Sequence, residues 1–283
     1  MKLLIIIISY IFFAPLIGGF LTGIDRRISA RMQRRVGPPL LQPFYDVRKL
    51  FQKENLAVRR SQNYFVFFYL IFVVFVGALF FTGGDLLLIF FALTLADIFF
   101  VLGGFKTSSP YSHVGANREL IQIMSYEPMM LFTVIGMYMV TKSFNVSQIV
   151  MFKGPMIIYL LGIFIGLLYV ITIKFRKSPF DLSMSHHAHQ ELISGITTEF
   201  SGKTLGLIEI SHWYEKVFIL GIVYLFFSFN PILAIIVGLA TYFLEIFIDN
   251  SYARVKWQFM LKSSWIVALV FGLGNILVLM FIL

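Results

Sequence analysis

Long apolar runs separated by polar stretches dominate this sequence. Eight runs of spanning length carry few charged side chains, and they cover residues 2–22, 63–82, 85–104, 119–141, 155–174, 204–228, 231–249 and 262–282. A transmembrane helix requires about 20 predominantly apolar residues, and continuously apolar runs exclude the alternating strands of a membrane β-barrel. The pattern therefore predicts an all-α polytopic membrane protein with eight transmembrane helices, forming a single integral membrane domain over residues 1–283.

The first apolar run is expected to stay in the mature protein. It is longer than the apolar region of a secretory signal peptide, and it continues into Asp25-Arg26-Arg27 without the small-residue pattern of a cleavage site. We therefore interpret residues 2–22 as a retained transmembrane helix.

Composition agrees with a membrane protein and excludes several kinds of chemistry. Of the 283 residues, 59% are hydrophobic and 13% are charged, and the mean hydropathy is +0.86. Soluble proteins are about 45–50% apolar and about 25% charged. The sequence has no cysteine, which excludes disulfides, thiolate nucleophiles and cysteine-ligated iron–sulfur clusters in this chain. Redox chemistry is therefore expected on another chain.

The net charge of +9 is informative through its placement. Nineteen of the 23 lysine and arginine residues lie in or at the edges of the connections that follow odd-numbered runs, ten of them within residues 23–62. Because cytoplasmic loops carry such an excess, both termini are predicted outside, and the long loops, about 23–62 and 175–203, in the cytoplasm. We interpret the charge as a topology signal and a contact with anionic lipids, with no nucleic-acid partner.

The first long loop contains a helical pattern. Gly37-Pro38-Pro39 interrupts the chain, after which Phe44, Val47, Leu50 and Phe51 recur at the spacing of one helix face. The pattern predicts a short amphipathic helix in the membrane interface between the first two spanning helices. A basic membrane-surface helix without a further role stays open on this pattern alone.

The second long loop concentrates ionisable side chains close to the membrane boundary. These residues are Asp181, His186, His187, His189, Glu191 and Glu199. A histidine-rich tract can bind metal, but the histidines here have no settled ligand spacing and no supporting cysteine. Packing against a partner subunit, or proton exchange at the mouth of a channel, is the better interpretation because histidine titrates near neutral pH.

Ionisable residues also occur inside the predicted helices, where they are rare and usually functional. Asp97 lies in the third run, Glu127 in the fourth and Glu245 in the seventh. Glu119 and Gln122 stand on one face at the start of the fourth run. They are placed to lead from the cytoplasmic surface toward Glu127.

The sixth run carries a polar stripe. Glu209, His212, Glu215 and Lys216 fall within an arc of roughly 120° on a helix. Ion pairs that hold helices together would explain any one of these residues. A hydrated proton path explains the set better, because desolvating so many groups only for packing is costly and buried carboxylates take up and release protons.

Three longer motifs connect these features to a known family. In chain order they are Arg34-Arg-Val-Gly-Pro-Pro-x-x-Gln-Pro-x-Tyr-Asp-x-x-Lys-Leu50, Gly115-Ala-x-Arg-Glu-Leu-x-Gln-x-Met-Ser-Tyr-Glu127 and Pro179-Phe-Asp-Leu…Gln190-Glu-Leu…Glu199-Phe-Ser-Gly202. Over nearly the whole chain the sequence resembles the eight-helix NuoH-like family of membrane subunits of respiratory complex I. With its histidine-containing stretch and Ile208-Glu-Ile-Ser-His-Trp213, it resembles the homologues in group 4 energy-converting nickel–iron hydrogenases and related sulfur reductases.

The resemblance implies a membrane anchor and ion-translocation coupling subunit of a prokaryotic inner-membrane complex that takes electrons from ferredoxin. It implies no catalytic centre and no cofactor in this chain, since the nickel–iron centre and the iron–sulfur clusters would lie in partner subunits. Expected partners are hydrogenase large-subunit-like and small-subunit-like chains on the long loops, antiporter-like subunits in the membrane, and the lipid bilayer.

The residue patterns and the resemblance together assign residues to these roles; the resemblance implies that Glu127, Glu191, Glu199, Glu209 and Glu215 lie near the path. The expected docking residues are Arg31, Arg34, Arg35, Gln42, Asp46, His186, His187 and His189. The expected ion path comprises Glu119, Glu127, Asp181, Glu191, Glu199, Glu209, His212, Glu215, Lys216 and Glu245.

Other interpretations stay open at this point. Complex I has a quinone chamber in this region, but residues 186–189 replace a run of alternating glutamates in that family, which disfavours quinone. The same subunit of a sulfur-reducing complex and a passive scaffold are further alternatives. A self-contained transporter is disfavoured because no internal repeat is apparent. Proton and sodium both fit buried carboxylates, and protons, sulfur and quinone all fit as electron acceptors.

Overall fold

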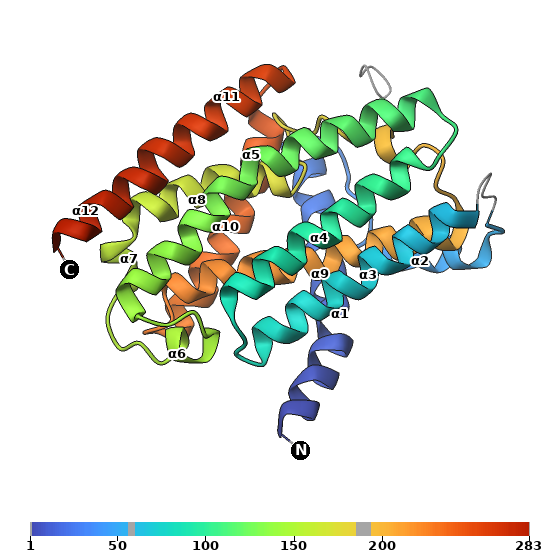
Figure 1. Cartoon of the computed structure of the whole chain (residues 1–283). Coiled ribbons are helices and arrows are strands. Elements are labelled where there is room, and N and C mark those ends of the chain that lie inside the picture. The colour runs from blue at the N-terminus through green and yellow to red at the C-terminus, as the bar shows by residue number, and fades with distance from the viewer. Residues whose placement is uncertain (1, 56–59, 185–193, 283) are drawn as a thin grey trace.

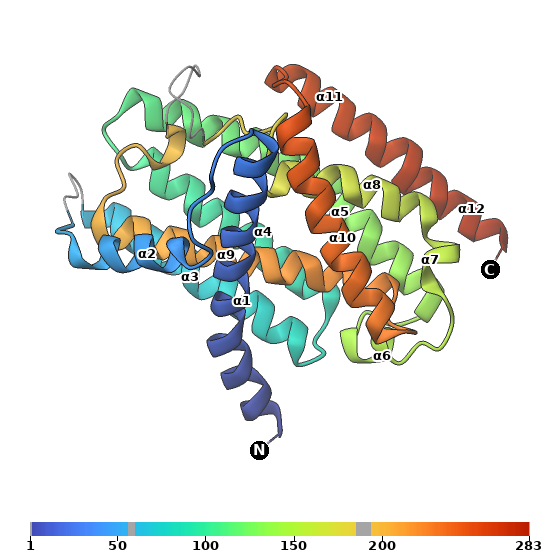
Figure 2. The ribbon, with the colours of Figure 1, turned by 180° about the vertical axis from the view of Figure 1, so that it is seen from behind.

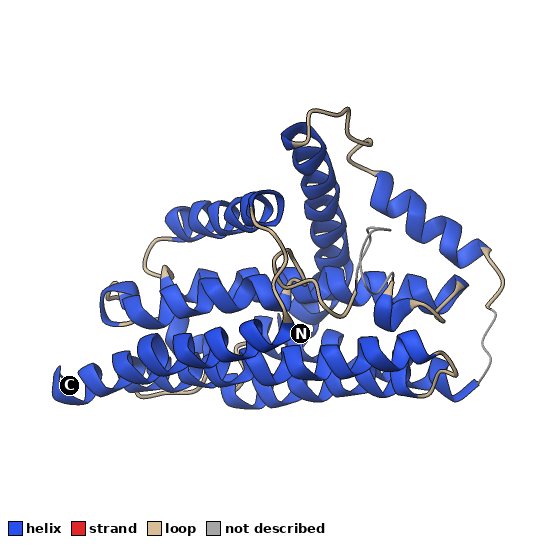
Figure 3. Cartoon of the chain, turned by 90° about the horizontal axis from the view of Figure 1, so that it is seen from above, coloured by secondary structure: helices blue, strands red, loops and turns tan. Residues whose placement is uncertain are grey.

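The computed structural model describes residues 2–55, 60–184 and 194–282, and within them every extended element is a helix (Figure 1 and Figure 3). In chain order these are α1 (Lys2–Met32), α2 (Gln42–Gln52), α3 (Arg60–Phe81), α4 (Leu86–Phe105), α5 (Pro110–Thr141), α6 (Val146–Val150), α7 (Met156–Tyr159), α8 (Leu161–Lys174), the 3-10 turn η1 (Gly195–Thr197), α9 (Gly202–Phe226), α10 (Pro231–Ser251), α11 (Trp257–Val267), the π-helical segment η2 (Ala268–Leu273) and α12 (Gly274–Ile282). The predicted all-α class is confirmed.

Six of the described helical segments are long and apolar enough to cross a membrane. They are α1, residues 61–81 of α3, α4, α5, α10 and the continuous segment from α11 through η2 to α12. The two remaining apolar runs differ. Residues 155–174 are divided at Leu160 between α7 and the 14-residue α8, and the 25-residue α9 carries the polar stripe. The count of eight spanning helices therefore stays a prediction.

The starts of two long helices are set by capping side chains. The Asp85 carboxylate accepts hydrogen bonds from the Leu87 and Leu88 amides at the start of α4, at 2.8 and 3.1 Å. Asn230 caps α10 in the same way, and Pro231 begins that helix, where a missing N–H is not needed. The turns before these caps are tight, so α3 and α4, and likewise α9 and α10, pack as neighbours.

Helix α9 lies at the centre of the bundle. It packs against α1, α2, α3 and α10, while α5 packs against α4, α8 and α11 (Figure 1). From behind, α1 and α10 lie in front of the bundle, and the N-terminal half of α1 extends beyond it (Figure 2). That half exposes large apolar side chains such as Leu4 and Phe12, as expected for a helix that faces lipid.

The predicted amphipathic helix is present as α2, and its apolar face packs on the protein. The Phe44 ring lies 5.1 Å from the Trp213 ring between centroids, and Val47 is buried. Gly206 on α9 leaves room for the Phe51 ring. Contact with α1 and α9 accounts for the apolar pattern, and a position of α2 in the membrane interface stays a prediction.

Helix α1 continues past residue 22 to Met32, into a region that the hydropathy pattern assigns to the first long loop. The predicted end of the first helix at residue 22 is wrong, because residues 23–32 stay helical where they pack on neighbouring segments. Gly23 allows the Leu40 carbonyl oxygen to approach, since a Cβ there would lie 2.0 Å from that oxygen. Asn250 of α10 donates a hydrogen bond to Ser29 at 3.0 Å. The continued helix carries Asp25 to the polar end of α10.

Candidate functional site

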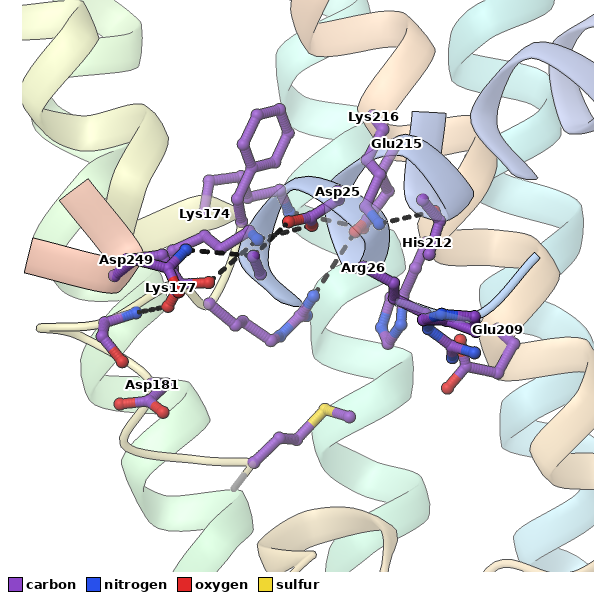
Figure 4. Close-up of a pocket in the computed structure, with 18 of the residues that line it drawn as sticks. Asp25, Arg26, Lys174, Lys177, Asp181, Glu209, His212, Glu215, Lys216 and Asp249 are labelled. Atoms are coloured by element: carbon purple, nitrogen blue, oxygen red, sulfur yellow. Dashed lines mark hydrogen bonds and ion pairs between the residues drawn. The ribbon is translucent and has the colours of Figure 1, made fainter. Parts of the chain in front are cut away.

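A polar cavity of about 460 Å³ opens between the C-terminal part of α1, the segment after α8, the polar stripe of α9 and the end of α10 (Figure 4). Its ionisable lining residues are Asp25, Arg26, Arg35, Lys174, Arg176, Lys177, Asp181, Glu209, His212, Glu215, Lys216 and Asp249. Charges of both signs therefore surround a space large enough for several water molecules, each of which takes about 30 Å³ in the liquid.

The end of α8 and the segment that follows it contribute three of the cations. Lys174 is the last residue of the helix, and Arg176 has a left-handed backbone with φ of 52°, which is uncommon for a residue other than glycine. The turn directs Lys174, Arg176 and Lys177 into the cavity lining. These residues counted as loop charges in the sequence, whereas their side chains are largely buried.

The innermost group is formed around Lys174. Its ammonium nitrogen lies 2.5 Å from Asp97 Oδ2, 3.3 Å from the Tyr126 hydroxyl and 3.4 Å from Glu215 Oε1. The Tyr126 hydroxyl donates to the same Asp97 oxygen at 2.5 Å. Helices α4, α5, α8 and α9 each contribute one of these residues, so the group joins four helices through one buried charge network.

Arg176 extends this network toward the cavity. It donates to both carboxylate oxygens of Glu119, with a shortest distance of 2.6 Å, and its guanidinium lies 3.6 Å from Glu215 Oε2. Burial by itself lowers the pKa of Arg176, but Glu119 and Glu215 raise it well above its ordinary value. Glu215 therefore stands between two cations, Lys174 and Arg176.

An outer group ties α1 to α10. Lys177 lies 2.5 Å from Asp25 and 3.0 Å from Asp249, and the Ser178 amide donates to Asp249 at 2.9 Å (Figure 4). Burial lowers the pKa of Lys177, but the two carboxylates raise it above its ordinary value overall. The ammonium is thus held in its charged form at neutral pH.

All four residues of the predicted α9 stripe line the cavity. Lys216 donates to the Thr22 hydroxyl on α1 at 2.8 Å, while Glu209 and His212 face the cavity farther along the stripe (Figure 4). Asp181 also lines the cavity and is paired with Arg254 from the segment before α11.

Other predicted path residues are placed elsewhere. Glu127 lines a separate small hollow with Phe90 and Met130. Glu245 is fully buried in α10, and within the described residues neither of its carboxylate oxygens has a hydrogen-bond partner. The Glu199 backbone carbonyl accepts a hydrogen bond from Gln62. The structure therefore does not bring Glu127, Glu199 or Glu245 into the cavity lining, whereas Glu119 reaches it through Arg176.

The predicted docking residues of the first long loop differ in their surroundings. Arg34 is exposed, and Arg31 borders a groove at the end of α1. Arg35 lines the polar cavity instead. Gln42 donates to Asp46 at 2.8 Å, and Arg26 pairs with the same carboxylate at 2.6 Å. Asp46 of α2 thereby pairs with Arg26 of α1 at the protein surface.

The histidine-containing part of the second long loop has no described structure. His186, His187, His189 and Glu191 lie outside the described residues. Nothing in the structure therefore bears on their assignment to docking or to the ion path.

Six charged members of the two groups are absent from the predicted path. They are Asp25, Asp97, Lys174, Arg176, Lys177 and Asp249. Asp97 stands out in the sequence only as an ionisable residue inside an apolar run. The other five lie at or beyond the ends of apolar runs, where a charge indicates the boundary of a span. A signal is present at Lys174-Phe-Arg-Lys177, because this basic cluster directly precedes the Pro179-Phe-Asp motif.

Comparison with protein families gives one match over residues 3–280, to the family described as NADH dehydrogenase. Hydrogenase-4 component C of Escherichia coli is 32% identical over 203 residues, which are 66% of this chain and 63% of that protein. The NuoH-type membrane subunit of the Helicobacter pylori NADH-quinone oxidoreductase is 28% identical over a 310-residue alignment, with 92% of this chain and 91% of the relative covered. The match to the hydrogenase component thus spans somewhat less than two thirds of that relative.

A solved structure shares the fold. It is that of the membrane-bound sulfane sulfur reductase, an archaeal respiratory membrane complex, and a chain of it superposes with a TM-score of 0.82. The superposition covers 97% of this chain and 100% of the other, at 24% sequence identity. The arrangement of helices described above is therefore one that occurs in a respiratory membrane complex.

Proposed function

This chain belongs to the NADH dehydrogenase family, and we propose that it is the membrane anchor and ion-translocation coupling subunit of an energy-converting hydrogenase-type complex. Its relatives are subunits of multisubunit membrane complexes. In the proposal, electrons from ferredoxin pass along cofactors in partner chains. A local electrostatic or conformational change at the two long loops, about 23–62 and 175–203, biases the protonation of the carboxylates in this chain. The ion moved is a proton or a sodium ion.

One observation carries the proposal. A connected series of ionisable side chains leads from the 460 Å³ cavity through Arg176 and Glu215 to Lys174 and Asp97, between α4, α5, α8 and α9. Ionisable groups at membrane depth are expensive and commonly mark ion pathways. Carboxylates and the Lys174 ammonium can exchange protons with neighbours within hydrogen-bond distance, the Arg176 guanidinium contributes a fixed positive charge, and the cavity has room for the water molecules that would supply protons.

The proposed partners follow from the same arrangement. Large-subunit-like and small-subunit-like hydrogenase chains would dock on the polar ends of the helices, where Arg31 and Arg34 are exposed. Antiporter-like subunits would lie beside the exposed apolar helix faces. The nickel–iron centre and the iron–sulfur clusters would belong to those partners, because this chain contains no cysteine to ligate them.

The test separates electron transfer from ion movement. Glu209→Gln and Glu215→Gln keep the shape of each side chain but remove its ability to carry a negative charge. We expect the hydrogenase activity of the purified complex in detergent to persist. The rate of ion-gradient formation in proteoliposomes should fall at least tenfold, which corresponds to a rise of about 1.4 kcal/mol or more in the activation free energy of ion transfer. Glu54→Gln, at an exposed position after α2, is the matched control and should leave both readouts unchanged.

The opposite result is equally clear. If both cavity variants form the gradient at the rate of the natural complex, the coupling assignment of the cavity is wrong and the chain acts as an anchor. Glu127→Gln, tested in parallel, determines whether the path includes the separate hollow next to Phe90.

A second candidate function is a quinone-binding subunit of a complex I-type dehydrogenase. The observation that favours it is the coverage of the match to the Helicobacter pylori NADH-quinone oxidoreductase protein, which extends over 92% of this chain. It predicts electron transfer from the purified complex to an added ubiquinone analogue. A hydrogenase-type complex without a quinone site would leave the analogue oxidised.

A further inference from the structure

The Lys174 ammonium is surrounded by oxygen atoms of Asp97, Tyr126 and Glu215, which come from three other helices. We call this cation position the seat. Asp97 of α4 contributes the nearest oxygen at 2.5 Å, and Tyr126 of α5 and Glu215 of α9 follow at 3.3 and 3.4 Å. The Lys174 and Asp97 side chains are 1% and 0% exposed. The ammonium is therefore a cation enclosed by protein oxygens at the inner end of the polar cavity.

The same oxygen set has the chemistry of a site for a small metal cation. Hard cations take carboxylate, hydroxyl and carbonyl oxygens as ligands, and the seat offers two carboxylates and a phenolic oxygen. The second Asp97 oxygen has no partner within the described residues, so its acceptor capacity is not exhausted. What fills the seat is an ammonium attached to the chain, supplied by the last residue of α8.

Electrostatic repulsion determines which cations can enter the seat. With Lys174 in place, a sodium ion entering from the cavity would meet an ammonium in the seat and the Arg176 guanidinium beside Glu215, at 3.6 Å from its carboxylate. Like charges in a medium of low effective dielectric repel strongly. A proton needs no vacant coordination position, because it adds to a carboxylate oxygen that is already present.

We propose that Lys174 is a specificity-determining residue, a tethered cation that keeps sodium out of the seat formed by Asp97, Tyr126 and Glu215 and so restricts ion transfer through this cluster to protons. The physiological meaning of this role rests on the proposed coupling function. The exclusion of sodium itself is a binding property, and it is measurable whether or not the subunit couples ion movement to electron transfer.

The experiment vacates the seat and measures sodium binding. The whole complex is purified with the natural chain and with Lys174→Ala, and saturable binding of radioactive ²²Na⁺ is measured with choline chloride as the balancing salt. We expect the variant to bind about one additional Na⁺ per copy of this chain, and its thermal midpoint to rise with NaCl concentration as expected for a ligand that binds only the folded state. Taking the difference removes sodium bound by other subunits.

Two further variants control for indirect effects. Lys216→Ala removes another ammonium of the cavity, a half-buried one that donates to Thr22 rather than to a carboxylate, so it should create no sodium site. Lys174→Ala combined with Asp97→Asn removes both members of the closest pair. It should abolish the additional sodium binding, and it avoids the buried unpaired carboxylate that destabilises the single variant.

Three results would overturn the inference. One is saturable sodium binding in the natural complex that Asp97→Asn abolishes, and another is the absence of additional binding in an assembled Lys174→Ala complex. The third is equal binding in the single and double variants. If Lys174→Ala does not assemble, Lys174→Gln is measured instead, because its amide keeps the volume without the charge. A failure of the gradient test on Glu215→Gln would leave these binding results unaffected, so the two proposals fail separately.

Discussion

Lys177 forms the ion pairs that connect α1 and α10 at the outer side of the cavity. It joins Asp25 of α1 to Asp249 of α10, two carboxylates that are far apart in the chain, and its side chain is 11% exposed. A buried ion pair contributes little net stability in many proteins, but removing one partner leaves an uncompensated buried charge. The structure therefore makes Lys177 a test of how tightly α1 is held.

Replacing Lys177 with methionine should destabilise the subunit by about 3 kcal/mol, because Asp25 and Asp249 lose their shared cation. Thermal or denaturant unfolding of the complex in detergent measures this loss. Lys53→Met, at an exposed position after α2, is the control and should change stability by less than about 0.5 kcal/mol. An equal effect of both substitutions would show that the cluster does not hold the helices.

The pH dependence of this loss has a defined sign. The pKa of Lys177 is raised in the folded chain, after burial is offset by Asp25 and Asp249. A raised lysine pKa contributes stability in full below the unfolded value of about 10.4, and this contribution is lost only as the pH rises through the still higher folded value. The difference between the natural chain and Lys177→Met should thus be constant from about pH 6 to about pH 9. A difference that shrinks within this window would contradict the assignment.

At the scale of elements, the close crossing of α1 and α9 sets the width of the cavity. A Cβ on Gly18 would lie 2.4 Å from the Trp213 carbonyl oxygen and 2.7 Å from the Trp213 Cβ, and one on Gly19 would lie 3.1 Å from the Trp213 ring. Small residues allow membrane helices to approach closely. The crossing therefore places Thr22 and Asp25, one and two turns farther along α1, against the cavity.

Gly18→Ala should separate α1 from α9 and cost about 1–3 kcal/mol, as overpacking of a close contact does. Gly238→Ala is the matched control, since a Cβ at Gly238 would meet no described atom within 4 Å; this substitution should be neutral or slightly stabilising. Unfolding of the purified complex compares the two variants. Equal stability of both would show that α1 does not depend on this approach.

At the scale of the whole molecule, the helix ends divide into two sets. The segment before α11 meets the segment after α8, where the Val255 amide donates to the Pro179 carbonyl at 3.2 Å. The turn before α4 meets the segment after α5 at the other end, where the Leu86 amide donates to Phe144 at 2.8 Å. The polar cavity opens at the first of these ends. The distribution of basic residues predicts that this end faces the cytoplasm.

Single-cysteine labelling tests this orientation, because the natural chain has no cysteine to give a background signal. Lys153→Cys and Lys256→Cys introduce exposed thiols at the two ends. A membrane-impermeant maleimide should label position 153 in intact cells and position 256 only after permeabilisation, as the excess of basic residues requires. The reverse labelling would invert the topology and place the cavity outside.

Much of the helical architecture is accessible from hydropathy, because a spanning helix is a local pattern of about 20 residues. The apolar runs and the observed helices agree closely for α3, α4 and α10, and the cap residues Asp85 and Asn230 lie where the runs begin. The α9 stripe is also accessible, since residues on one helix face repeat at a fixed period. The break at Leu160 and the continuation of α1 to Met32 depend on packing, so hydropathy does not predict them.

The pairing of charges is decided by the tertiary structure alone. Lys174 meets Asp97 and Glu215, and Lys177 meets Asp25 and Asp249, across separations that no local pattern encodes. A lysine at the end of an apolar run indicates a solvent-facing loop by the positive-inside rule. Lys174 and Lys177 nevertheless point into the cavity because the backbone turns after α8. Residue types and helix faces follow from local physical chemistry, whereas the partner of each buried charge depends on which helices pack together.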